Sequence, residues 1–148
     1  MFDFINKFTN YVLQKVKQTD VYLVFDRYHS YSIKRMTRSK RAGTKVTRKY
    51  HLHLESILPP QHVVLKMQEN KVQLLQILCE HLLQQGSSIG RLHKLVVTSQ
   101  QSVPVQVTNN RSEPRLEFKT DHEEADVIIV QQTVVGQRCD KGSYRCHL

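Results

Sequence analysis

The chain has 148 residues, of which 39% are hydrophobic, and its 22 lysines and arginines against 13 acids give a net charge of +9. This length fits one domain with a single core, and no apolar run reaches the roughly 18–20 residues that a membrane span requires, so the sequence predicts an intracellular protein. The three cysteines form no C-x-x-C pair, which excludes both a disulfide framework and a zinc knuckle.

The first expected elements are a helix and a strand. Apolar residues recur at helical spacing between Phe2 and Lys17, which predicts an amphipathic helix that ends near Gln18. β-branched, aromatic or leucine residues then fill positions 21–25, a pattern typical of a buried strand in a parallel sheet. Asp26 ends this strand, at the place where open α/β sheets bind ligands.

A basic segment follows, from Arg27 to Leu54. It contains no acid, and its nine basic residues account for the whole net charge of the chain. Such a local concentration of charge favours a polyanion, and we predict that these residues bind the phosphates of DNA or RNA. A solvated basic face is the alternative. The candidate nucleic-acid-binding residues are Arg27, Lys34, Arg35, Arg38, Lys40, Arg41, Lys45, Arg48 and Lys49.

The middle of the chain continues the alternation of helices and strands. Leucines at three- and four-residue spacing predict a helix over residues 69–85, closed by Gly86, and residues 92–97 predict a second strand. The polar stretch through residues 100–110 is typical of a short β-hairpin or a loop. This order of elements favours a layered α/β fold over an all-β fold or a helical bundle.

The last expected helix opens on a cluster of acids. Thr120 begins a capping box, which predicts a helix from about Asp121. Glu124 and Asp126 then stand directly before an apolar run, where crowded carboxylates repel one another unless a cation or the helix N-terminus relieves them. Two explanations stay open: the acids complement the helix dipole, or they bind a hard cation. The same choice applies to Asp26, for which capping of a turn is the simpler role.

Two stretches of the sequence resemble nucleases. VYLVFDRYHSYSIKRMTRSKRA is similar to the strand, aspartate and basic segment of flap endonucleases and XPG-type nucleases, although Arg27 stands where that family has glycine. HEEADVIIV is similar to the E-x-E helix start of these enzymes and to PIN-like domains of transposon-associated animal proteins. The resemblance implies a PIN/FEN-like α/β fold with a central, mostly parallel sheet. It also implies catalytic, metal-ligating roles for Asp26, Glu124 and Asp126, which would hold Mg²⁺ or Mn²⁺ for phosphodiester hydrolysis.

The chain also departs from this family. No D-x-D strand follows the last expected helix, and no early aspartate follows a strand as that role requires. Residues 1–135 are therefore expected to form a partial PIN/FEN-like domain, incomplete at its C-terminus, with a basic excursion at 27–54. Residues 136–148 are expected to form an irregular tail, which we interpret as the result of truncation or an altered reading frame. With these ligands absent, little or no nuclease activity is expected from the chain alone.

Two functions stay open from the sequence. The first is a nucleic-acid-binding fragment of a divalent-metal-dependent nuclease-like domain, and the second is a non-catalytic module that binds nucleic acid or protein. The expected partner is DNA or RNA and not a membrane, and an unpaired sheet edge would allow self-association. The motifs G-x-x-x-x-G-K-[ST] and G-x-S-x-G do not occur, which excludes nucleoside triphosphate hydrolysis and esterase chemistry of the usual kinds.

Overall fold

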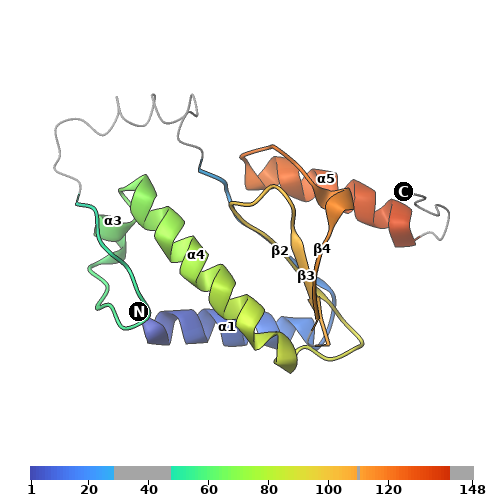
Figure 1. Cartoon of the computed structure of the whole chain (residues 1–148), viewed down its shortest axis with the longest axis horizontal. Coiled ribbons are helices and arrows are strands. Elements are labelled where there is room, and N and C mark those ends of the chain that lie inside the picture. Colours follow the sequence, from blue (N-terminus) through green and yellow to red (C-terminus); the bar gives the residue numbers. More distant parts are fainter. Residues whose placement is uncertain (29–47, 110, 141–148) are drawn as a thin grey trace.

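The computed structural model describes residues 1–28, 48–109 and 111–140, which form helices around one sheet (Figure 1). Helices α1, α3, α4 and α5 span, in that order, Phe2–Val16, Gln61–Val64, Gln68–Gln84 and Ala125–Asp140. Strands β1 to β4 span Val21–Val24, Leu95–Thr98, Val105–Thr108 and Arg111–Pro114. The short 3-10 helices η1 and η2 span Gln85–Ser88 and Leu116–Phe118. The predicted α/β class is confirmed.

The sheet is mixed, because only β1 and β2 run parallel. Its strand order is β1-β2-β3-β4, and the chain passes through α4 between the two parallel strands. The β2–β3 and β3–β4 pairs are antiparallel. The prediction of a mostly parallel sheet is therefore wrong, since the later strands follow one another through connections too short for a crossover. The predicted hairpin is confirmed, and its turn contains Asn109 with a φ of 47°, a left-handed conformation that asparagine tolerates.

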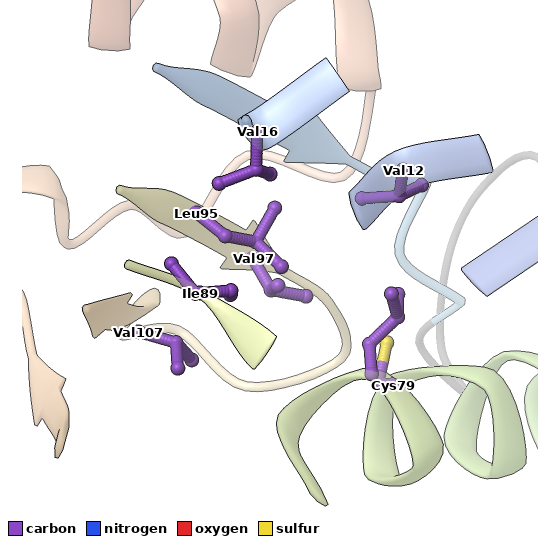
Figure 2. Packing of buried hydrophobic residues seen from close by; sticks show 8 residues of the cluster. Val12, Val16, Cys79, Ile89, Leu95, Val97 and Val107 are labelled. Carbon is purple, nitrogen blue, oxygen red and sulfur yellow. The ribbon is translucent and has the colours of Figure 1, made fainter. Parts of the chain in front are cut away.

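One face of the sheet packs against α1 and α4 and forms the main core. Leu95 of β2 belongs to one buried cluster with Val12 of α1, Cys79 of α4 and Val107 of β3 (Figure 2). Burial raises the pKa of Cys79 to about 11, so this thiol stays neutral and unreactive at ordinary pH. Gly86 follows α4, and a Cβ there would lie 2.7 Å from a methyl carbon of Val107, so the close approach requires glycine. The helices predicted over residues 2–17 and 69–85 are confirmed.

The opposite face of the sheet is covered by α5 and η2. Phe118 and Ile128 are fully buried there. Tyr22 of β1 meets Phe118 edge-on, with ring centroids 5.9 Å apart, and Gln132 of α5 donates a hydrogen bond of 2.6 Å to the hydroxyl of Thr98. The sheet thus lies between α1 and α4 on one side and α5 on the other (Figure 1).

Helix α5 differs from its prediction at both ends. It begins at Ala125, four residues after the predicted start, and it continues to Asp140. The expected irregular tail is therefore wrong for residues 136–140, where the helix continues even though the apolar pattern weakens after Val130. Residues 141–148 lie outside the described residues.

Candidate nucleic-acid interface

Asp26 follows the C-terminal end of β1 and caps α5. Its Oδ1 accepts a hydrogen bond of 2.9 Å from the backbone N–H of Ala125, the first residue of the helix and 99 positions further along the chain. The negative carboxylate also complements the positive end of the helix dipole. The predicted local cap is wrong: the hydroxyl of Thr120 instead accepts the N–H of His122 at 3.2 Å, which makes a turn ahead of the helix.

Arg27 fastens the neighbouring loops to the same end of β1. Its side chain is only 4% exposed. Its guanidinium donates hydrogen bonds to main-chain carbonyls on both sides, after β2 and ahead of α5, namely those of Ser99, Gln101, Thr120 and His122. Burial lowers the pKa of Arg27, and the nearby carboxylate of Asp121 acts in the opposite direction. Because its guanidinium forms these hydrogen bonds inside the protein, Arg27 is not available to contact nucleic acid.

The three acids predicted to ligate a metal lie at the start of α5. Carboxylate oxygens of two of them, and the main-chain carbonyl oxygen of the third, accept hydrogen bonds from main-chain N–H groups. Asp26 caps the helix, and Asp126 Oδ1 accepts the N–H of Val127 at 2.9 Å. The carbonyl of Glu124 accepts the helical hydrogen bond from Ile128 at 3.1 Å. Within residues 1–28, 48–109 and 111–140, no group of three His, Cys, Asp or Glu side chains is placed to hold a metal ion. These acids do not fit a preformed metal site, and their catalytic and metal roles stay predictions.

The last residues of the basic segment run along α4 as a return arm, defined here as residues 48–52. The Asn70 side chain accepts the N–H of Tyr50 at 2.9 Å and donates to the carbonyl of Arg48 at 3.0 Å. The Gln73 side chain accepts the N–H of Leu52 at 3.1 Å and donates to the carbonyl of Tyr50 at 2.9 Å. Two side-chain amides on α4 thereby satisfy main-chain groups of the return arm that would otherwise need a neighbouring strand.

Both ends of the basic segment lie beside the N-terminal end of α4. The Lys71 ammonium of α4 sits over the ring of Tyr28, 5.7 Å from its centroid. Asn70, the next residue on that helix, holds the return arm. Residues on both sides of the undescribed stretch 29–47 thus contact α4. Six predicted nucleic-acid contacts fall between these ends and outside the described residues: Lys34, Arg35, Arg38, Lys40, Arg41 and Lys45.

Arg48 and Lys49 are predicted contacts that the structure describes on the protein surface. Both are exposed. The Arg48 guanidinium lies 5.8 Å from the centroid of the Tyr50 ring, which is a cation–π arrangement. Exposed cations on a main chain that is held in place meet the first requirement for phosphate contacts.

A second basic surface lies at the β3–β4 hairpin. It was not predicted from the sequence. A cavity of about 510 Å³ opens there between Arg91, ahead of β2, and Arg111 of β4, with Glu113 also in its lining. Both arginines are exposed, and neither side chain has a hydrogen bond or ion pair within the part of the chain that the structure describes. Twenty positions separate them in the sequence, so no local charge run marks the pair. It offers a control of equal charge for experiments on the basic segment.

None of the described helices combines the length and apolarity needed to cross a bilayer. Comparison of the chain with protein-family models, with curated proteins and with solved structures finds no match. The function is therefore argued from the charges and contacts of the chain itself.

Proposed function

We propose that this protein is a nucleic-acid-binding module that holds phosphates with its basic segment. The carrying observation is the place of the charge: the whole +9 falls between Arg27 and Leu54, and both ends of this stretch contact one end of α4. Phosphate backbones of DNA and RNA are the natural polyanions for so local a cluster. The alternative, a module that binds protein, does not by itself account for this concentration of positive charge.

Anchoring at both ends supports this proposal. Asp26 and Arg27 fix the chain where it leaves β1, and Asn70 with Gln73 fixes it where it returns to α4. A loop held at both ends loses less conformational entropy on binding than a free tail does, because fewer arrangements are open to it beforehand. The described ends of the basic segment are thus held in place without a contribution from Glu124 or Asp126.

Metal-dependent phosphodiester hydrolysis is the second candidate. One observation favours it: Asp26, from a strand end, lies against the helix start that carries Glu124 and Asp126. The finer proposal, a fragment of a PIN/FEN-like nuclease that uses Mg²⁺ or Mn²⁺, depends on this proximity and on the sequence resemblance. The capping contacts argue against it for the isolated chain, so we expect binding without cleavage.

One experiment separates the two candidates. Labelled single-stranded and branched DNA and RNA are incubated with the protein in Mn²⁺ and in EDTA, at two salt concentrations. We expect binding that weakens steeply with salt and no cleavage in either buffer. Cleavage that requires Mn²⁺ and is lost in Asp26→Asn would establish the second candidate, since asparagine keeps a capping oxygen but is a poor metal ligand. Absence of both binding and cleavage would contradict the proposal itself.

A further inference from the structure

We propose that the protein self-associates by pairing the open edge of β1 with β1 of a second copy. Among the described residues β1 pairs with β2 alone, so it forms one border of the sheet. The other border, β4, has the sequence Arg-Ser-Glu-Pro and is exposed along its length. Charge and proline are typical protection against edge-to-edge pairing. The Val-Tyr-Leu-Val sequence of β1 has neither.

The hydrogen bonds of β1 show which main-chain groups face the open edge. The N–H groups of Val21 and Phe25 donate to β2 or its flanks, at 2.9 Å and 3.0 Å. Because main-chain groups alternate in direction along a strand, those of Tyr22 and Val24 point away from β2. An extended peptide backbone supplies both donors and acceptors at the spacing that these groups need. The edge therefore fits another strand.

A groove beside this edge extends the same surface. It has a volume of about 340 Å³ and lies between Tyr22 and Val24 of β1 and Ile129 and Gln132 of α5. Gln132 is 3% exposed, and its Oε1 has no hydrogen-bond partner in the described part of the chain. A buried hydrogen-bond acceptor that lacks a donor lowers the stability of the fold. Ile129, which is 50% exposed, is the apolar side chain of α5 that lines this groove.

The β1 sequence is complementary to itself. In an antiparallel pair centred on Leu23, Tyr22 of one copy stands opposite Val24 of the other, and the reverse contact is equivalent by symmetry. Aromatic and β-branched residues are favourable cross-strand partners. The four residues of β1 carry no charge, so no like charges face each other within this strand pair. A second copy therefore supplies hydrogen-bond partners for the main-chain groups at the edge of β1 and covers the groove between β1 and α5.

Sedimentation of the full chain, without nucleic acid, tests this proposal at increasing protein concentration. We expect a monomer–dimer equilibrium that stops at the dimer. Ile129→Glu, and independently Thr133→Glu, should raise the concentration of half-association by about tenfold or more, since each places a charge in the groove to be buried. The matched control is Ile57→Glu, which is 95% exposed, precedes α3 and does not line the groove between β1 and α5, and it should not change the equilibrium.

Amide hydrogen exchange locates the contact. The N–H groups of Tyr22 and Val24 should exchange fast in the monomer and slow as the dimer forms. A monomer at every concentration, assembly beyond the dimer, or equal weakening by Ile57→Glu would overturn the proposal. So would protection of both amides in the monomer, because another part of the same chain would then cover the edge. None of these outcomes depends on nucleic-acid binding.

Discussion

Arg27 and Arg48 stand at the two ends of the basic segment, with the same charge and opposite surroundings. Arg27 is buried and donates to carbonyls of two loops, whereas Arg48 is exposed over the ring of Tyr50. The first cation stabilises the junction of β1 with α5, and the second is available to a ligand. Equal charge in one segment therefore does not mean equal function, and burial decides which cations bind a partner.

The largest effect expected from this comparison is the loss of Arg27. Arg27→Met should lower the free energy of unfolding by about 3 kcal/mol, because several carbonyls lose a charged donor in a site that water reaches poorly. Urea unfolding followed by circular dichroism measures the change. Arg48→Met is the matched control and should stay within about 0.5 kcal/mol of the wild type. A similar loss in both variants would show that the two arginines do not differ as described.

The second-largest effect on stability is expected at Asn70, which holds the return arm. Asn70→Ala should cost about 2 kcal/mol, because Asn70 is fully buried and its removal leaves main-chain groups of Arg48 and Tyr50 without partners. Gln76→Ala, on the same helix but exposed, should cost little. Thermal unfolding of the two variants compares them, and an equal shift in Tm would contradict the anchoring role of Asn70.

The cap of α5 should give a smaller effect. Asp26→Ala should cost about 1 kcal/mol, the usual loss for a missing helix cap. Asp26→Asn should cost a few tenths of a kcal/mol, because it keeps an oxygen acceptor for Ala125 and loses the charge at the helix end. Unfolding curves of the pair separate these terms. If asparagine proves as damaging as alanine, the negative charge of Asp26 matters more than its hydrogen bond.

The smallest effect on stability should come from the exposed pair. Arg48→Ala with Lys49→Ala should change the free energy of unfolding by about 0.5 kcal/mol or less, since both residues are exposed. The same urea experiment provides the value. A loss comparable to that of Arg27→Met would mean that this pair, too, is structural.

Local patterns predicted those parts of the fold that depend on local interactions. Apolar spacing identified α1 and α4, and a run of β-branched and aromatic residues identified β1. The short connection after β2 is also typical of antiparallel pairing and conflicts with the expectation of a parallel sheet. Helix ends were less predictable, since α5 takes its cap from Asp26, far away in the sequence.

The positions of the candidate site residues were predicted from the sequence, but their contacts were not. The sequence placed Asp26 at a strand end and Asp126 near a helix start, and both positions are correct. It could not show that their oxygens would meet main-chain N–H groups, because that depends on how α5 docks on the sheet. Nor could it separate Arg27 from the exposed cations, since charge counts contain no information on burial. An arginine three residues after an apolar strand was the one available signal.

The central claim is tested most directly by affinity for labelled single-stranded DNA and RNA in two variants of equal charge. Arg48→Ala with Lys49→Ala removes cations of the basic segment, and Arg91→Ala with Arg111→Ala removes as many from the hairpin surface. The first pair should weaken binding to every sequence and lower the slope of log K against log salt by about 2, and the second should leave both nearly unchanged. Equal effects, or a larger effect of the hairpin pair, would contradict the assignment of nucleic-acid binding to the basic segment.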